Sequence, residues 1–521
     1  MSLFEPFRPS ATSAADDREP FASPVGEAEA QTVLTHLSRC PHCRISVRTA
    51  GTPAPAVCPY CGRALDQTEE RVPVAEKVDP PSQAEIDERL RRIYHRPPLP
   101  VIALIAAGAV FILAWAVYGQ MHTLREWWYN ALAVGLYSAV AGLFVITRFL
   151  FAAFYRAPAE AGFEPTVSVL VPCFNEGEAI RQTIERIFAT GYPEDKLEVV
   201  CVNDGSKDDS LKHMMAAQTR HPRLVVVNFE TNRGLCHGWG VGTFIARGEF
   251  LVCVDSDTFV FPGSLRKLMQ AFADPTVGGV SGHCDVENAS VNLLTKMQDV
   301  RYYFSYKIMK AAESVFGTVS CLPGCFSAYR RTCVLAVLDK WINATVMGEH
   351  GNFADDRSLT NCILKDYRIV YDDQALATTI APEKWKQYAK QQARWSRSYL
   401  REIWKTGKFM WRKHPVPALS WYAMMWMPLV EPLIMLWARV VMPVMAALDP
   451  ASKMSVGSLL LFYAVGVFAI TGVWCLHFLA SNGRRWWWAG FAFTLSYVAF
   501  FSWQIYWALL TLRGKKWGTR G

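Results

Sequence analysis

The chain has 521 residues, of which 51% are hydrophobic, and a formal net charge of +8 at pH 7. This length allows two or three domains. The basic residues are scattered and lack the aromatic-interleaved pattern of nucleic-acid-binding segments, so we predict no nucleic-acid partner. The hydrophobic content is concentrated in long apolar runs without a polar face, which favours a membrane protein over an entirely water-soluble enzyme.

The N-terminal region contains two closely spaced cysteine pairs. Residues 1–35 are rich in Pro, Ala, Ser and acids, which predicts disorder, and no secretory signal is expected there. The pairs Cys40/Cys43 and Cys58/Cys61 follow, with fourteen residues between them. Two CxxC knuckles at this spacing suit Zn²⁺ held by four thiolates. We therefore predict a structural zinc ribbon over residues 36–66 that docks an unidentified protein partner; redox dithiols are the alternative.

Four apolar runs are long enough to cross a hydrocarbon layer of roughly 30 Å, which takes about 20 helical residues. After a linker at 67–98, with a helix near 82–94, two transmembrane helices are expected within 99–155. Further segments are expected within 417–512. The stretch 418–448 is interrupted by Pro428, Glu431 and Pro432. We interpret it as a short hairpin or re-entrant pair bent near Glu431-Pro432, giving six membrane segments; one kinked helix would give five.

The position of basic residues predicts the orientation of these segments. Arginines precede the first run and follow the second, and the tail 513–521 is basic. Positive residues remain in the cytoplasm. We expect a multi-pass protein of the plasma or inner membrane, in contact with the lipid bilayer, with both termini and the central domain cytoplasmic. A cytoplasmic location also argues against disulfides among the 14 cysteines.

The central region, residues 164–380, alternates predicted strands and helices. Strands are expected at 166–172, 197–202, 224–228 and 251–254, and helices at 178–189, 210–219 and 238–247. This alternation predicts an α/β domain with a doubly wound, Rossmann-like, mostly parallel sheet. Ligands of such sheets bind at the carboxyl ends of the strands.

Polar residues follow three of these strands. The first two are followed by Asn175 with Glu176, and by Asp204. Asp255 and Asp257 follow the strand at 251–254, and two carboxylates this close repel each other unless a cation lies between them. Oxygen ligands suit Mg²⁺ or Mn²⁺ shared with a phosphate. The alternative is a solvated Asp-Ser-Asp turn.

Two later motifs also contain reactive side chains. Asp355 and Asp356 precede an apolar helical periodicity, which suits either a general base or an acid pair at a helix N-terminus. In QQARW, Gln391, Arg394 and Trp395 share one helical face. Arg394 can contact a diphosphate and Trp395 can stack on a sugar. The surrounding residues, 381–416, also predict basic amphipathic helices at a membrane surface.

Six motifs together resemble the family 2 glycosyltransferases, and in particular their processive membrane synthases of hyaluronan, chitin, Nod-factor chitooligosaccharide and cellulose. They are PCFNEGE, VNDGS, VDSDT, SCLPGCFSAYR, ADDRSLTN and QQARW. The resemblance implies a GT-A type catalytic domain embedded in a transmembrane helical bundle, and it extends from about Arg91 to the C-terminus. The zinc ribbon lies outside it.

The resemblance also implies roles for the residues already named. Asn175, Glu176 and Asp204 would contact the uridine of a UDP-sugar. Asp257 would bind Mg²⁺ or Mn²⁺ with Asp255 beside it. Asp356, next to Asp355, would be the general base. Gln391, Arg394 and Trp395 would serve the donor diphosphate and the growing polysaccharide acceptor.

These implications lead to one main functional hypothesis. We expect a processive, inverting glycosyltransferase that polymerises a sugar from a UDP-sugar, most consistently UDP-GlcNAc, into a chitin- or hyaluronan-type chain and exports it. Hyaluronan synthases tend to carry a basic Gly-Lys-Arg stretch where this chain has Asn232-Arg233-Gly234, and many relatives have Gly at the position of Ala354. These departures leave the product open. Alternatives are a cellulose-like glucan synthase using UDP-glucose, a lipid-linked monoglycosyltransferase, and a catalytically silent scaffold.

Overall fold

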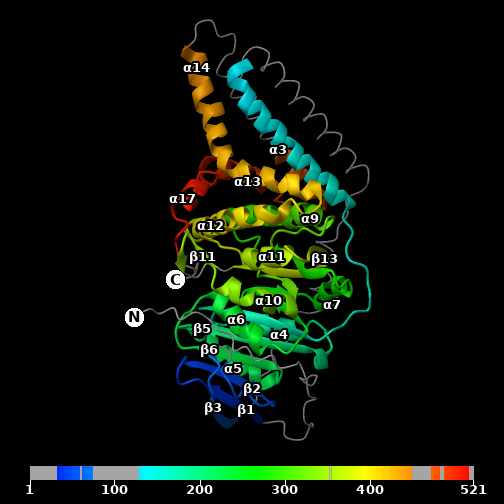
Figure 1. Cartoon of the computed structure of the whole chain (residues 1–521), viewed down its shortest axis with the longest axis vertical. Helices are drawn as coiled ribbons and strands as arrows, with labels where there is room; N and C mark the ends of the chain where they lie inside the picture. Colours follow the sequence, from blue (N-terminus) through cyan, green and yellow to red (C-terminus); the bar gives the residue numbers. More distant parts are fainter. Residues whose placement is uncertain are drawn as a thin grey trace.

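The computed structural model describes residues 32–58, 61–73, 128–350, 353, 355–448, 471–481 and 486–514. Several predictions fall outside these residues: disorder at 1–31, the helix near 82–94, the first apolar run and nearly all of the basic tail. In Figure 1 the N-terminal strands lie at one end of the molecule. The large sheet lies in the middle, and long helices project from the other end.

A single sheet of eleven strands organises the central domain, in the order β3-β1-β2-β6-β5-β4-β7-β10-β9-β13-β8. The block β6-β5-β4-β7 is parallel throughout. Every residue of β4 and β5 is buried, as expected for strands covered on both faces. The bounds of the strands of the central domain are β4 Val167–Cys173, β5 Leu197–Asp204, β6 Leu224–Phe229, β7 Phe250–Cys253, β8 Thr258–Val260, β9 Val277–Val286, β10 Ser327–Arg330 and β13 Arg368–Thr379.

The prediction of a mostly parallel sheet is wrong beyond this block. Strand β10 runs antiparallel to both neighbours, β7 and β9, and β8 is antiparallel to β13. Only β9 and β13 add another parallel pair. The sheet is therefore mixed, because the chain after β7 no longer alternates one strand with one crossover helix.

Helices cover the sheet and follow the predicted order. The predicted helices and strands around β4 to β7 agree with the structure within a few residues at each end. The helices packed on this sheet are α4 Ala179–Phe188, α5 Ser210–Arg220, α6 Leu235–Ile245, α7 Ser264–Gln270, α10 Arg331–Ile342 and α11 Asp356–Leu364. A small separate ribbon, β11 Thr345–Val346 with β12 Glu349–His350, precedes α11.

The N-terminal strands extend the sheet of the central domain. Strand β2, Ile45–Ala50, pairs antiparallel with β6, and β1, Thr32–Arg39, lies between β2 and β3, Asp66–Pro73. Two boundaries are corrected: β1 begins inside the segment predicted to be disordered, and β3 continues into the predicted linker. Hydrogen bonds to both neighbours order β1, although its composition is polar.

The remaining helices pack above the sheet, where α12 and α13 lie across it and α3 and α14 project away (Figure 1). Among the described residues, α13 alone is long and apolar enough to cross a membrane. A second span counts only if Ala489–Phe501 and Gln504–Leu510, bent by 42°, act as one. The bounds are α3 Trp128–Phe154, α8 Leu293–Tyr303, α9 Ala311–Ser314, α12 Trp385–Met410, α13 Pro415–Leu436, α14 Met442–Leu448, α16 Ala489–Ser496 and α17 Gln504–Leu510.

The hairpin expected near Glu431 does not form. Helix α13 continues through Pro428, Glu431 and Pro432, and the chain changes direction later, at a π-helical turn over Trp437–Val441 (Figure 1). Pro428 and Pro432 each remove one backbone donor without ending the helix. The apolar stretch is therefore two helices joined by a bend.

Two glycines with similar backbone conformations allow the cost of backbone strain to be distinguished from the cost of a steric collision. Gly205 (φ +71°) and Gly263 (φ +74°) are both left-handed. A Cβ at Gly205 would lie 2.6 Å from backbone atoms of Thr231 and Asn232, whereas nothing lies within 4 Å at Gly263. We predict that Gly263→Ala costs about 1 kcal/mol through backbone strain, and that Gly205→Ala costs about 1–3 kcal/mol more. Thermal unfolding of the purified variants measures both, and equal losses would contradict the collision.

Candidate active site

One cavity of about 1000 Å³ lies between the carboxyl ends of the parallel strands and the helices that pack above the sheet. Its lining includes nearly all of the residues singled out by the sequence. They are Glu176, Asp204, Asp255, Asp257, Asp355, Asp356, Gln391, Arg394 and Trp395. Segments far apart in the chain therefore contribute to one site.

Asp204, the last residue of β5, lies at one end of the cavity. Its two carboxylate oxygens accept hydrogen bonds from the backbone N–H groups of Arg233, at 2.6 Å, and Gly234, at 2.8 Å. Burial raises the pKa of Asp204 to about 6, against the lowering effect of these hydrogen bonds. The loop after β6 thus fixes the carboxylate at the end of β5.

Asn175 performs a structural task beside this end. It has a left-handed backbone, φ 56°, and its Oδ1 accepts a hydrogen bond from the Lys207 N–H at 2.9 Å. Its own N–H donates to Ser206 Oγ. Of the described residues in this loop, Glu176 lines the cavity and its neighbour Asn175 does not. Asn175 ties together the loops that follow β4 and β5.

Asp255 and Asp257 lie between β7 and β8 with their carboxylates toward the cavity. The Thr258 N–H donates to the Asp255 carbonyl, so the Asp-Ser-Asp turn does form, and Thr379 Oγ1 donates to Asp257 Oδ1 at 3.2 Å. Burial, followed by the charges of Asp257 and Asp356, raises the pKa of Asp255 to about 7. Burial raises the pKa of Asp257 to about 6, and Arg394 opposes both shifts. A cluster of carboxylate oxygens that resists ionisation fits a hard divalent cation such as Mg²⁺ or Mn²⁺.

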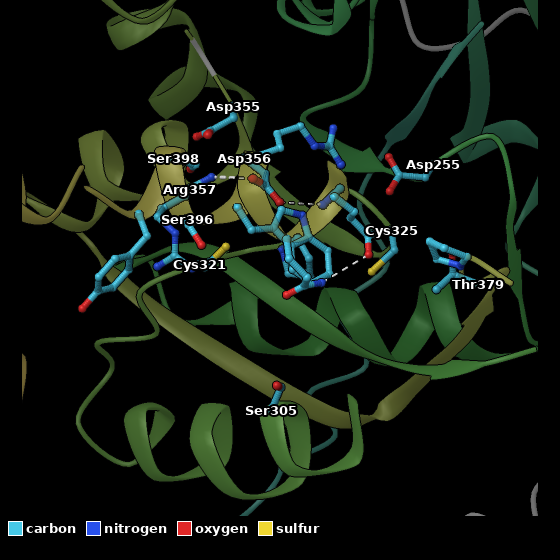
Figure 2. Close-up of a pocket in the computed structure, with 18 of the residues that line it drawn as sticks. Asp255, Ser305, Cys321, Cys325, Asp355, Asp356, Arg357, Thr379, Ser396 and Ser398 are labelled. Carbon is cyan, nitrogen blue, oxygen red and sulfur yellow. Dashed lines mark hydrogen bonds between the residues drawn. The ribbon is translucent and has the colours of Figure 1, made fainter. Parts of the chain in front are cut away.

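The paired acids at α11 have different surroundings. Asp355 is the N-cap of α11, where its Oδ1 accepts the Ser358 N–H at 2.8 Å in a capping box. Asp356 occupies the first turn and accepts the N–H groups of Arg357, at 2.8 Å, and Gly324, at 3.3 Å. Burial, and then the charge of Asp355, raises the pKa of Asp356. Figure 2 shows Asp356 and Asp255 facing the same cavity from separate segments.

Gly324 brings the two acid clusters together. A Cβ on this residue would lie 2.8 Å from Asp255 Oδ1, while its N–H points to Asp356. Its neighbours Cys321 and Cys325 also line the cavity (Figure 2), and Cys325 Sγ lies 3.1 Å from the Tyr306 hydroxyl. The loop between α9 and β10 therefore forms the floor between Asp255 and Asp356.

Helix α12 closes the site from above. Gln391, Arg394 and Trp395 line the cavity, and the intervening Gln392 is buried. Arg301 of α8, which the sequence reasoning missed, donates to Gln392 Oε1, and its guanidinium carbon lies 5.3 Å from the Trp395 ring centroid. The sequence offered one signal, a lone arginine preceding the aromatic cluster at residues 302–306, but its partner on α12 is more than 85 residues away.

A mixed sheet with carboxylates gathered at its carboxyl edge is typical of GT-A glycosyltransferases. The comparisons agree: residues 168–337 match the family model "Glycosyl transferase family 2". The chain is a glycosyltransferase with a family 2 catalytic domain. A mannosyltransferase from Pyrobaculum calidifontis, solved with GDP-Man and Mn²⁺, has a similar fold, with a TM-score of 0.50 and 22% identity over 70% of this chain and 98% of that one.

Two curated relatives extend the similarity beyond the family model. The hyaluronan synthase of Streptococcus pyogenes is 28% identical over 305 residues, which cover 57% of this chain and 71% of the relative. The N-acetylglucosaminyltransferase of Rhizobium meliloti (strain 1021) is 32% identical over 248 residues, covering 47% of this chain and 58% of the relative.

Gly324 provides a test of the shared floor. In Gly324→Ala the new methyl group must displace the Asp255 carboxylate, which is the end of a side chain and can rotate. We therefore predict a change in the free energy of unfolding below about 1.5 kcal/mol, with a loss of about tenfold or more in Mg²⁺ affinity. Thermal unfolding and Mg²⁺ titration measure the two effects. Unchanged Mg²⁺ affinity would contradict this account of the floor.

Asp255 also predicts a pH dependence of stability. Its pKa of about 7 in the folded protein exceeds the ordinary value of 3.8, so its stabilising contribution is complete below about pH 4 and is lost as pH rises through 7. Asp255 alone contributes at most about 1.4 kcal/mol per pH unit to the slope of the free energy of unfolding against pH. Asp255→Asn should flatten this slope in chelator, measured by unfolding between pH 5 and about 8, whereas the exposed Asp195→Asn should keep it. An unchanged slope in Asp255→Asn would contradict the assignment.

Proposed function

We propose that the chain is a processive, inverting glycosyltransferase that polymerises a sugar, N-acetylglucosamine in our assignment, from its UDP-linked donor and exports the chain through a membrane. One observation carries this proposal. The lining of a single cavity includes Asp204, the acids at β7 and α11, Trp395, and Glu431 on the apolar helix α13. The proposed donor, catalytic and exit positions would therefore share one continuous space.

The donor would occupy the end of the cavity nearest β5. Glu176 and Asp204 would contact the uridine, with Asn175 holding the loops around it. Asp255 and Asp257 would hold Mg²⁺ or Mn²⁺, which is consistent with Mn²⁺ in the structurally similar mannosyltransferase. Such an ion neutralises charge on the leaving diphosphate.

Asp356 would be the general base of a direct displacement. It would accept the proton of the acceptor hydroxyl as that oxygen attacks the anomeric carbon and UDP leaves, which inverts the configuration at that carbon. Its raised pKa suits this task, because the carboxylate then binds a proton more readily. The N–H groups of Gly324 and Arg357 fix its orientation. Asp355 would act through α11, as the cap that positions Asp356.

Helix α12 would hold the diphosphate and the acceptor. Arg394 would pair with the diphosphate, since a guanidinium binds two phosphate oxygens at once. Trp395 would stack on the acceptor sugar, with Gln391 beside it on the same helical face. Arg301 would keep the Trp395 ring in place through its cation–π contact. A site that holds the end of a polysaccharide after each addition is what processive synthesis requires.

The membrane assignment draws support from the apolar surface above the sheet. Large hydrophobic side chains are exposed along four helices, at Leu143 and Phe154 of α3, Leu419 and Trp426 of α13, Leu448 of α14 and Trp507 and Leu510 of α17. Exposed apolar surface of this extent marks an interaction with lipid or protein. Glu431 faces the cavity and accepts a hydrogen bond from the Tyr497 hydroxyl at 3.3 Å, so a polar group lines the proposed exit path. Cytoplasmic termini and several crossings remain part of the proposal.

The sugar assignment draws support from the names of two relatives, a hyaluronan synthase and an N-acetylglucosaminyltransferase. Two other products differ in measurable ways. A glucan synthase would consume UDP-glucose, and a monoglycosyltransferase would release a lipid carrying one sugar.

The test is polymer synthesis by the purified full-length chain with separate UDP-sugars and Mg²⁺. We predict UDP release with UDP-GlcNAc and a polymer that chitinase or hyaluronidase digests. Asp356→Asn should lower the rate by about 10²–10⁴-fold, whereas the exposed Asp339→Asn should not. Trp395→Ala should shorten the product more than it slows UDP release. Absence of turnover with every UDP-hexose would overturn the proposal, and a single-sugar lipid product would replace it with the monoglycosyltransferase.

A further inference from the structure

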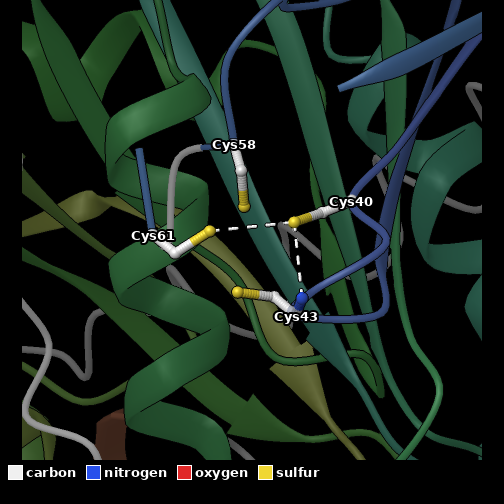
Figure 3. Close-up of side chains that lie close together, drawn as sticks. All are labelled: Cys40, Cys43, Cys58 and Cys61. Carbon is white, nitrogen blue, oxygen red and sulfur yellow. Dashed lines mark hydrogen bonds between the residues drawn. The ribbon is translucent and has the colours of Figure 1, made fainter. Parts of the chain in front are cut away.

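The four N-terminal cysteines form a compact cluster at the edge of the catalytic sheet. The sulfur atoms of Cys40, Cys43, Cys58 and Cys61 all lie within 4.8 Å of one another, and three of these residues are buried (Figure 3). Four thiols converging from two turns match the donor set of a closed, tetrahedral Zn²⁺ site.

The two cysteine turns share one hydrogen-bond pattern. In the first, the Arg44 N–H donates to the Cys40 carbonyl at 2.9 Å, and the Cys40 N–H donates to the Ile45 carbonyl at 2.8 Å. In the second, Gly62 and Cys58 repeat both bonds at 2.9 and 2.7 Å. Arg44 and Gly62, which follow the second cysteine of each pair, both have positive φ angles. Two unrelated loops with one backbone geometry are expected when both present thiolates to the same ion.

The first cysteine turn is attached to the loop of residues 230–234, which follows β6. Glu230 pairs with Arg39 at 2.6 Å and lies 3.8 Å from Arg44, on either side of the turn. The Arg233 guanidinium donates a hydrogen bond to the Cys43 carbonyl. Pairing of Ile45 with Phe229 across β2 and β6 fixes the register between the two segments.

The same loop forms part of the catalytic cavity on its other side. Asn232 and Gly234 line the cavity, and the N–H groups of Arg233 and Gly234 hold Asp204. Arg233 therefore connects a cysteine ligand position to the carboxylate at the end of β5: its side chain contacts Cys43 and its backbone contacts Asp204.

We propose that the cysteine cluster binds one Zn²⁺ and that the bound ion, by fixing the Cys43 carbonyl, holds the 230–234 loop in the form that presents Asp204 to the donor nucleotide. The cluster is then a metal-dependent control of donor binding. The second part of this inference rests on the proposed function, whereas Zn²⁺ binding does not. Without the ion, nothing covalent holds the two turns together, and the Arg233 side chain loses a fixed acceptor.

The first measurement is metal content of the purified full-length chain by mass spectrometry. One Zn²⁺ per chain is expected, with loss in both Cys43→Ser and Cys58→Ser. Cys362→Ser, a cysteine of α11 outside the cluster, should retain it. Absence of Zn²⁺ from the folded wild-type chain, after supply of the ion, would overturn the site.

The second measurement is a cycle of UDP affinity by calorimetry in Mg²⁺, with and without removal of Zn²⁺ by a chelator that does not bind Mg²⁺. In the wild-type chain, removal should weaken UDP binding about tenfold, as expected for loss of one hydrogen bond at a charged group. In Arg233→Ala, UDP binding is weaker from the start, and removal of Zn²⁺ should change it no further. Arg63→Ala, an exposed arginine of the second turn, should behave as the wild type.

Hydrogen exchange gives a readout that does not need a nucleotide. Amides of residues 230–235 should exchange faster after Zn²⁺ removal in the wild type, because their anchor at Cys43 is lost. Equal UDP affinity with and without Zn²⁺ would overturn the coupling. Absence of UDP binding in the untreated wild type would instead count against the proposed function, so the two failures are distinguishable.

Discussion

Like-charged carboxylates held close together in a buried space are the constraint on which the rest of the structure depends. The parallel strands β5 and β7 deliver Asp204, Asp255 and Asp257 to one edge of the sheet, and α11 adds Asp356 opposite them. Burial raises the pKa of each of these carboxyl groups, and the charges of Asp257 and Asp356 raise the pKa of Asp255 further. Within the protein, Arg394 lowers the pKa of Asp255, Asp257 and Asp356 and so partly balances their charge. The arrangement is unfavourable in isolation, and a bound divalent cation removes much of that cost.

The surrounding contacts make sense as devices that hold this charge cluster open and separate. Asp204 is held by two backbone N–H groups, Asp257 by Thr379 and Asp356 by the N–H groups of Gly324 and Arg357. Each of these donors comes from a different segment from its acceptor, except Arg357. Gly324 lets the backbone approach Asp255 without a side chain between them. The fold thus stores unfavourable electrostatic energy at the site and supports it with hydrogen bonds around the rim, as is common where chemistry occurs.

Sequence reasoning located the parts of this site that depend on local pattern. Apolar runs ending in Asp or Asn predicted β4, β5 and β7 and placed the acids at their carboxyl ends, because strand period and strand direction are encoded locally. Three features escaped: the antiparallel β10, the pairing of β2 with β6, and the contact of Arg301 with Gln392. Each depends on register between segments far apart in the chain, which no short pattern specifies. Asn175 has a role that the sequence did not suggest, since its side chain accepts a hydrogen bond from Lys207 and so joins two loops.

The pairing of β2 with β6 has a physical reason: β6 is the last strand of the parallel block and would otherwise be an edge strand. Strand β6 has the apolar sequence LVVVNF. If it were an edge strand, its unpaired backbone groups and apolar side chains could pair with other chains. The N-terminal strands cover it and move the free edge outward to β3, whose sequence DQTEERVP is charged and ends in proline. Charge and proline on an edge strand discourage further pairing. The register that protects β6 also sets Cys43 beside Arg233, so protection of the edge and contact with the loop at Asp204 follow from one strand pairing. A module added only to cover an edge would not need four converging thiols, which is why we propose a second role for the cysteine turns, exerted through the contact of the Cys43 carbonyl with Arg233.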